Sequence, residues 1–214
     1  MKVIHVFNEF KFSGAEIMYV DAAPLFQQKG CELTAVSTSD QLGDYSPYFE
    51  KAGYKLMHLP LPPLKRLGAR IRFYKNFIKL LKCEKYDIVH IHRSDAMWGI
   101  ALCAWLAGVK SLYTFHNVFP TKSYTYIYHC LLRFSAKRIF NCSFQTISDS
   151  VYNHELHFFH NRTTKVYNWY SNHRFYPENP GEKEEIRKEL GIPIDSLVVI
   201  SIGGCSHIKR HSDI

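Results

Sequence analysis

The feature that most constrains the fold is an alternation of short apolar runs with longer segments of helical periodicity. The apolar runs predict strands at 3–7, 32–37, 55–59, 87–91, 109–115, 144–147 and 165–167. The intervening segments predict helices at 14–28, 47–52, 66–82, 96–107, 123–137 and 151–159. Strands without polar alternation are typical of a parallel sheet covered on both faces. Residues 1–170 therefore predict an α/β domain built on a doubly wound parallel sheet.

The pattern changes character after this domain. Residues 171–195 predict an irregular linker and a charged helix, Glu182–Leu190, closed by Gly191. Ser196–Ile202 then predicts a new buried strand, followed by Gly203-Gly204. We expect 196–214 to be the truncated start of a second domain, because so few residues cannot build a core.

Composition favours a globular protein of the cytoplasm. Of the 214 residues, 46% are hydrophobic, which is enough for a sizeable core. The apolar run after Met1 is too short for a signal peptide, and Met97–Val109 falls short of the roughly 20 residues that a spanning helix needs. Six scattered cysteines without a C-x-x-C pair predict reduced thiols.

Positive charge is concentrated in one segment. The formal net charge is +8, and Lys65–Lys85 holds eight Lys/Arg against one acid, Glu84. The cations recur at helical spacing beside an apolar stripe, which is typical either of a surface that meets anionic membranes or of a solvated helix face. No RNA-binding motif or recognition helix is present, so nucleic acid is not an expected partner.

The loop after the first strand carries a possible phosphate site. Ser13-Gly14-Ala15-Glu16 has the capping-box pattern, with Ser13 as N-cap and Glu16 reaching back. Free N–H groups at this helix start would face the carboxyl edge of the sheet, where they favour phosphate. The alternative is an ordinary capped helix. The chain has neither G-x-G-x-x-G nor a Walker lysine, so the common dinucleotide and P-loop sites are not indicated.

Histidines mark the ends of two strands. His90 and His92 share a face, so they could bind a metal, but no third ligand is evident and the pattern favours buried, hydrogen-bonded rings. Arg93 follows them and either meets an anionic ligand or lies at the surface. His116, followed by Asn117, is placed to bind a sugar hydroxyl or polarise a reacting group.

Polar residues follow two further strands. Ser148 is a predicted N-cap after 144–147, and Asn168 follows 165–167. His154, His157 and His160 recur every three residues but are mixed with phenylalanines, which favours a half-exposed helix face over a metal stripe. Neither G-x-S-x-G nor a catalytic carboxylate pair is visible, so hydrolysis is not indicated.

The order of these segments resembles that of a known enzyme family, the retaining GT-B-fold glycosyltransferases of family four. The resemblance covers nearly the whole chain and is carried by Met1–Val6 with Ser13–Glu16, Tyr86–His92, Thr114–His116, Ile147–Ser150, Val166–Asn168 with Phe175–Pro177, Arg187–Pro193, and Val198–Gly203. It departs from the family at Ser13, where a glycine is more usual, and after Asn168, the one residue kept of the family's N-G-V-D turn.

The resemblance implies a Rossmann-like, acceptor-side N-terminal domain and a nucleotide-sugar-binding C-terminal domain. A hexosyl-type sugar would pass from a nucleotide donor to a polysaccharide or lipid-linked glycan with retention, without a metal or cofactor. His116 inherits the position beside the donor sugar, as the catalytic residue. Gly14 and Lys209 inherit the family's role of binding the donor diphosphate. At position 204 this chain has glycine in place of the arginine that usually accompanies the lysine.

The cleft residues expected beside them are Ser13, Arg93, Asn117, Ser148 and Asn168. The resemblance also implies peripheral contact of the basic segment 65–85 with the inner face of the cell membrane. Two other functions stay open at this point, a GT-B-like sugar-nucleotide epimerase and a non-catalytic basic module that binds membranes or nucleic acid. The 214-residue chain alone is expected to be inactive.

Overall fold

A computed structural model describes residues 1–118, 122–177, 179, 181–203, 210 and 213. Within it the chain forms two compact units, Met1–Ser171 and Asn172–Ile214, and each is described by itself. No helix among the described residues combines the length and the apolar character needed to cross a bilayer.

The first unit is built on a seven-stranded sheet in which every pair of neighbouring strands is parallel. The strands are β1 (Lys2–Phe7), β2 (Glu32–Ser37), β3 (Lys55–His58), β4 (Ile88–Ile91), β5 (Lys110–Phe115), β6 (Ser143–Thr146) and β7 (Thr164–Lys165). Their order across the sheet is β3-β2-β1-β4-β5-β6-β7. The predicted doubly wound parallel sheet is confirmed.

The helices connect consecutive strands, as the periodicity predicts. They are α1 (Gly14–Gln28), α2 (Ser46–Lys51), α3 (Leu67–Glu84), α4 (Met97–Ala107), α5 (Tyr126–Arg138) and α6 (Asp149–Asn153). Short 3₁₀ turns, η1 (Ser94–Ala96) and η2 (Ser123–Thr125), precede α4 and α5. The predicted helix at 151–159 differs, because α6 begins two residues earlier and passes into a π-helical turn, η3 (His154–Phe158).

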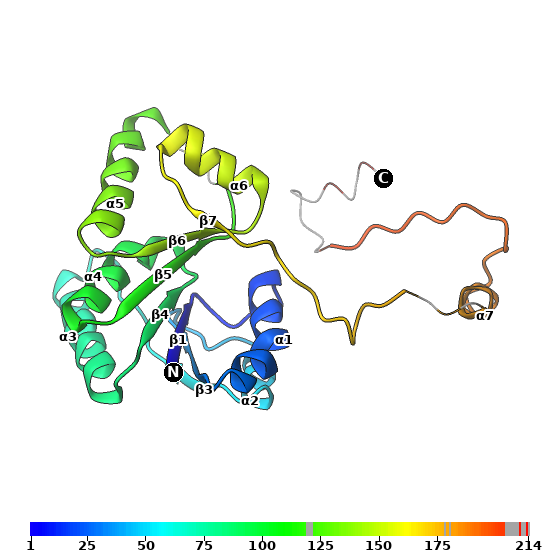
Figure 1. Ribbon diagram of the computed structural model, residues 1–214, viewed down its shortest axis with the longest axis horizontal. Coiled ribbons are helices and arrows are strands. Elements are labelled where there is room, and N and C mark those ends of the chain that lie inside the picture. Colours follow the sequence, from blue (N-terminus) through cyan, green and yellow to red (C-terminus); the bar gives the residue numbers. More distant parts are fainter. Residues whose placement is uncertain (119–121, 178, 180, 204–209, 211–212, 214) are drawn as a thin grey trace. The chain divides into compact units, whose positions relative to one another are not determined.

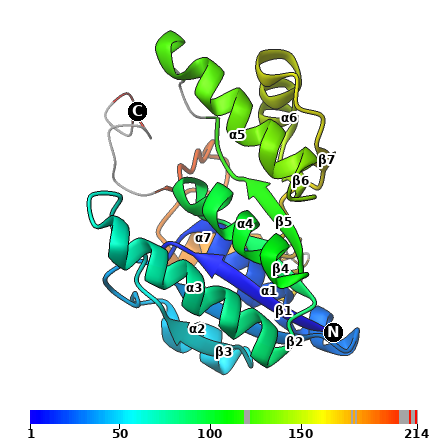
Figure 2. The same cartoon turned by 90° about the vertical axis from the view of Figure 1, so that its left-hand side faces the viewer.

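Two hydrophobic cores lie on opposite faces of the sheet. Ile4 and Val6 face a core shared with α3 and α4, whereas Val3 and Phe7 face a second core shared with α1 and α2. This division follows from the alternation of side chains along a strand. Figures 1 and 2 show these helix pairs on the two sides of the sheet.

The strand order reverses direction between β1 and β4. From β1 the chain winds outward through β2 and β3, then returns to β4 and winds the other way. In open parallel sheets, ligands bind at such a switch point, in the crevice beyond the carboxyl ends of the strands. A ligand site is therefore expected at the loops that follow β1 and β4.

The second unit contains one helix among its described residues, α7 (Glu182–Glu189), at the predicted place. The predicted strand Ser196–Ile202 is absent, and Leu197 and Ile202 are 92% and 88% exposed. A strand needs a neighbour to satisfy its backbone groups and to cover its side chains. The described part of this unit offers none, so the apolar run stays extended and unpaired.

Candidate functional site

The loop between β1 and α1 brings Ser13 to the carboxyl edge at the switch point. Ser13 is the N-cap residue of α1, with extended backbone angles, but its side chain does not cap the helix backbone. Its hydroxyl donates instead to the carboxylate of Glu16. The capping box is therefore wrong in detail, because Glu16 is buried and its carboxylate takes the Ser13 hydroxyl as a partner. Burial raises the pKa of Glu16, and the Ser13 hydrogen bond partly opposes that rise.

Gly14 opens α1 without a structural need for glycine. Its backbone angle lies outside the left-handed region, and a Cβ added there would meet no atom within 4 Å. The backbone at Gly14 thus borders open space at the helix N-terminus. Such a position allows a ligand to approach the main chain closely.

Four histidines gather on one face of the sheet where β1, β4 and β5 lie side by side. His5 and His90 are paired across β1 and β4, and His92 lies two residues beyond His90 on the same face. His5 Nδ1 lies 3.1 Å from His92 Nε2, and His92 Nδ1 lies 3.1 Å from His116 Nε2. His90 Nε2 pairs with Thr114 Oγ1 at 2.8 Å.

Burial keeps these rings neutral. It lowers the pKa of His5 to about 3 and that of His116 to about 4, from an ordinary value of 6.5. Burial, reinforced by the neighbouring imidazoles, also holds the pKa values of His90 and His92 well below that value. At neutral pH each ring therefore carries one N–H and one lone pair.

The stability of the fold should consequently fall as the pH drops below about 6.5. In that range the unfolded chain binds protons at these histidines that the folded chain does not, so acid favours unfolding. Each such histidine contributes up to about 1.4 kcal/mol per pH unit. Urea unfolding at pH 7.0 and pH 5.5, above the range in which most carboxylates titrate, measures this loss. Equal free energies of unfolding at the two pH values would contradict it.

The cluster contains a third possible metal ligand, His5, beside His90 and His92. Ligand atoms of His5, His90 and His92 all lie within 4.8 Å of one another, so the geometry places His5 beside the predicted pair. The sequence hid this residue because it lies 85 positions before His90, inside an apolar strand. In the structure, each of these three rings pairs through a nitrogen with another side chain, as buried polar groups generally do.

His116 and Asn117 lie just beyond β5, at the edge of the sheet. The His116 ring is partly exposed, and only its Nε2 is hydrogen-bonded to a described residue, so Nδ1 is left for another partner. Asn117 is exposed. This part of the edge offers hydrogen-bonding groups that a ligand in the crevice could reach.

Arg93 has a different surrounding from the one expected for an anion-binding residue. Its guanidinium forms two hydrogen bonds with the Asp95 carboxylate, at 2.6 and 2.8 Å, and a third with the Thr38 carbonyl oxygen at 2.8 Å. The Arg93 side chain is 16% exposed. It ties the end of β4 to the end of β2, and most of its donors are used inside the protein.

Ser148 and Asn168 lie at the same edge, beyond β6 and β7. Ser148 is the N-cap of α6, and its hydroxyl accepts a hydrogen bond from the Val151 backbone N–H at 3.3 Å, as predicted. Asn168 is exposed, and its neighbour Trp169 donates from Nε1 to the Met18 carbonyl oxygen in α1 at 2.9 Å. This contact, which the sequence did not signal, draws the segment after β7 back to α1. Lys209 and Gly204 lie outside the described residues.

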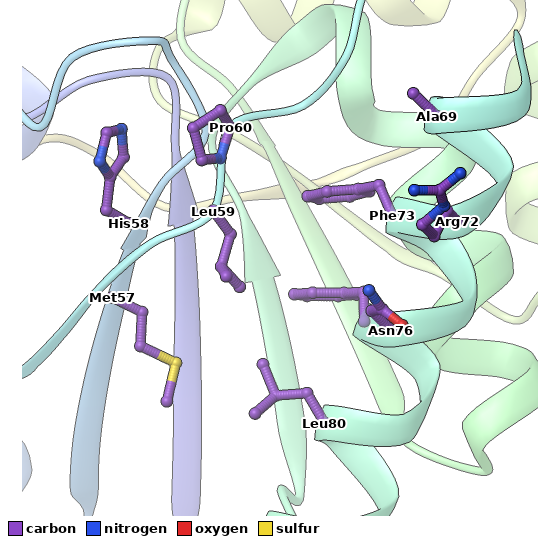
Figure 3. Close-up of a pocket in the computed structure, with 10 residues that line it drawn as sticks. Met57, His58, Leu59, Pro60, Ala69, Arg72, Phe73, Asn76 and Leu80 are labelled. Carbon is purple, nitrogen blue, oxygen red and sulfur yellow. The ribbon is translucent and has the colours of Figure 1, made fainter.

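An apolar cavity of about 520 Å³ lies elsewhere in this unit, between β3 and α3 (Figure 3). Leu59, Phe73 and Leu80 point into it from opposite sides. Its polar lining residues are His58, Arg72 and Asn76, and all three are exposed at the surface. The apolar lining suits a hydrocarbon group, and the lining residue Arg72 places a cation beside that group.

Solved structures of glycosyltransferases share this fold. The chain is similar to a glycosyltransferase from Rickettsia africae, with a TM-score of 0.68 and 17% identity over 91% of this chain and 50% of that one. It is also similar to Anabaena Alr3699/HepE in complex with UDP, with a TM-score of 0.69 and 17% identity over 89% and 50%. The chain thus spans about half the length of each, and the likeness establishes a Rossmann-like domain of GT-B type.

Sequence comparison gives the family. The chain is 28% identical over 114 residues to the capsular polysaccharide biosynthesis glycosyltransferase CapH of Staphylococcus aureus, which is 53% of this chain and 30% of that protein. Residues 12–203 match the family model described as Glycosyltransferase Family 4. That match includes the loop at Gly14, the β4–β5 histidines and the linker helix. The chain therefore belongs to Glycosyltransferase Family 4.

Proposed function

We propose that this chain supplies the acceptor-side part of an enzyme that transfers a hexosyl-type sugar, with retention, from a nucleotide sugar to a polysaccharide or lipid-linked glycan. The observation that carries the proposal is that His116 and the start of α1 lie at the same carboxyl edge of the sheet, beside the switch point of a family-four domain. The name of CapH and the UDP and UDP-glucose complexes of HepE support a polysaccharide product and a nucleotide-sugar donor.

In this proposal His116 donates a hydrogen bond to the donor sugar, and the backbone N–H groups at Gly14 meet its diphosphate together with Lys209. Ser13, Asn117, Ser148 and Asn168 line the crevice on the acceptor side, whereas Arg93 shapes its floor. Residues 1–170 form the acceptor-side domain, 171–195 the linker, and 196–214 the opening of the donor-side domain. The exposed apolar run Leu197–Ile202 supports this division, because neighbouring strands of a second domain would cover it.

The test is transfer of a labelled sugar from UDP-, GDP- and dTDP-sugars by a longer protein in which the second domain is complete. The 214-residue chain is the matched comparison. We expect turnover only from the longer protein. Full activity from the shorter chain would overturn the division of the site between two domains.

Gly14→Ala separates binding from folding. The added methyl group meets nothing in the protein, so the free energy of unfolding should change by less than about 1 kcal/mol. A diphosphate close to the backbone would clash with it, so donor affinity in the longer protein should fall about tenfold or more. Calorimetric titration with the nucleotide sugar measures the affinity, and urea unfolding provides the control. Unchanged affinity would remove Gly14 from the diphosphate site.

We further propose that a lipid-linked acceptor is held at the membrane by α3, with its hydrocarbon chain in the cavity of Figure 3. The exposed lining residues His58, Pro60 and Arg72 lie near the carboxyl end of β3, four strands from β5. At the usual strand spacing of nearly 5 Å this is about 19 Å from His116. Exposed apolar side chains on α5 add to the surface on this face of the sheet: Ile127, Tyr128, Leu131 and Phe134.

Charge reversal on α3 tests the membrane contact. Lys75 and Lys79 are exposed, and each cation near an anionic bilayer contributes about 1 kcal/mol. Lys75→Glu combined with Lys79→Glu should therefore weaken binding to phosphatidylserine vesicles about 30-fold or more, as measured by co-sedimentation. Lys29→Glu with Lys51→Glu, on the α1–α2 side, is the matched control. An equal loss in the control, or no vesicle binding by the unaltered protein, would contradict the proposal.

A further inference from the structure

An unbroken line of imidazole rings leads from the interior of the sheet to its carboxyl edge. His5 in β1 contacts His92 after β4, and His92 contacts His116 after β5, each through a nitrogen-to-nitrogen distance of 3.1 Å. The rings of His5 and His92 are nearly parallel, with an interplanar angle of 5°. His90 lies beside this line but pairs with Thr114 instead.

Counting protons leaves two arrangements for the line. Each neutral ring has one N–H, and each contact needs one N–H facing one lone pair. If His92 carries its proton on Nδ1, it donates to His116 and accepts from His5, so His116 must be protonated on Nδ1. If His92 carries its proton on Nε2, the direction reverses, and His5 must be protonated on Nε2.

The surroundings of His5 decide between them. His5 is 1% exposed, and its Nε2 is buried without a hydrogen-bond partner. A buried N–H without an acceptor costs about 1–3 kcal/mol and is rare, whereas an unused lone pair is tolerated more often. His116 Nδ1, by contrast, belongs to a partly exposed ring at the edge, where water or a ligand can accept a hydrogen bond from its N–H. The first arrangement is therefore favoured.

We infer that His5 and His92 are positioning residues that hold His116 in its Nδ1–H tautomer, so that His116 presents a hydrogen-bond donor at the carboxyl edge. The inferred role in transfer rests on the proposed function, but the tautomer itself does not. A fixed donor at this place would meet an oxygen of the donor sugar without first having to select the correct proton position. The free-energy cost of fixing the His116 tautomer is met during folding, before the sugar binds.

The tautomers can be read from long-range ¹H–¹⁵N spectra of the chain labelled at histidine, at pH 7.5 and without substrate. We expect His116 to show a protonated Nδ1 and an unprotonated Nε2. His92→Asp replaces the donor that faces His116 Nε2 with an acceptor, so His116 Nε2 should become protonated. His92→Asn keeps an N–H donor near the position of Nδ1 and should leave the His116 signals as they are. Thr114→Val, which alters His90 alone among the four rings, should leave His116 unchanged.

An Nε2–H tautomer at His116 in the unaltered chain would overturn the inference, and this reading stands even if the His92 variants do not fold. An unprotonated His116 Nε2 in a folded His92→Asp variant would overturn it as well. So would tight binding of one Zn²⁺ per chain that His5→Leu abolishes, because a metal would occupy the lone pairs of the line. Since none of these readings needs a donor or acceptor, their failure is distinguishable from failure of the glycosyltransferase proposal.

Discussion

His116→Ala is expected to lower the rate of sugar transfer by the longer enzyme about 10²- to 10³-fold. A positioned donor that acts on developing charge commonly contributes a factor of this size. The ring lies at the edge of the sheet and is partly exposed, so its loss should leave the fold intact. Steady-state kinetics with the labelled nucleotide sugar measure the effect, and the loss should fall mainly on kcat.

His157→Ala is the matched control for this variant. His157 is an exposed histidine of η3 and belongs neither to the proposed crevice nor to the cavity of Figure 3. Its replacement should change kcat less than about threefold. Equal losses for the two variants, or a tenfold or smaller loss for His116→Ala, would remove His116 from the catalytic position.

Arg133→Met is expected to destabilise the first unit by about 3–5 kcal/mol, because it leaves the Glu155 carboxylate buried without its cation. Arg133 donates to both carboxylate oxygens, at 2.7 and 2.8 Å, and the Glu155 side chain is only 3% exposed. The guanidinium carbon also lies 3.6 Å from the centre of the Phe159 ring. Urea unfolding of the 214-residue chain measures the change.

The double variant Arg133→Met with Glu155→Gln separates the buried charge from packing. With the carboxylate gone, the amide can keep its contact with Asn161, and most of the lost stability should return. A double variant as unstable as Arg133→Met would mean that the guanidinium stabilises α5 and η3 through packing against Phe159. A single variant within about 1 kcal/mol of the unaltered chain would contradict the account of the pair.

Periodicity predicted the first unit well, because each of its strands and helices buries one face and thereby leaves a pattern in the sequence. The same reasoning failed at Ser196–Ile202, where the pattern is that of a strand but the described residues supply no neighbour. Pairing is a property of two segments, so one segment cannot reveal it. The helix predicted over 151–159 also differs, because it contains the π-helical turn η3. Such a turn keeps nearly the apolar spacing of an α-helix, so the sequence pattern does not distinguish the two.

The site was predictable in its placement more than in its contacts. Polar residues after successive parallel strands must share an edge, which is why His116, Ser148 and Asn168 could be expected there. The partners of those residues depend on strand order and side-chain direction. In the sequence His5 is one residue of an apolar strand, and nothing there indicates its contact with His92. The sequence likewise does not indicate that the Arg93 guanidinium pairs with the Asp95 carboxylate.

The edge formed by Gly14 and His116 is proposed to face the nucleotide-sugar donor. A crystal structure of the longer protein with an unreactive nucleotide sugar would show whether it does. We expect His116 Nδ1 within about 3.2 Å of an oxygen of the donor sugar, and the diphosphate beside the backbone of Gly14. A donor bound away from the carboxyl edge, with neither residue in contact, would contradict it.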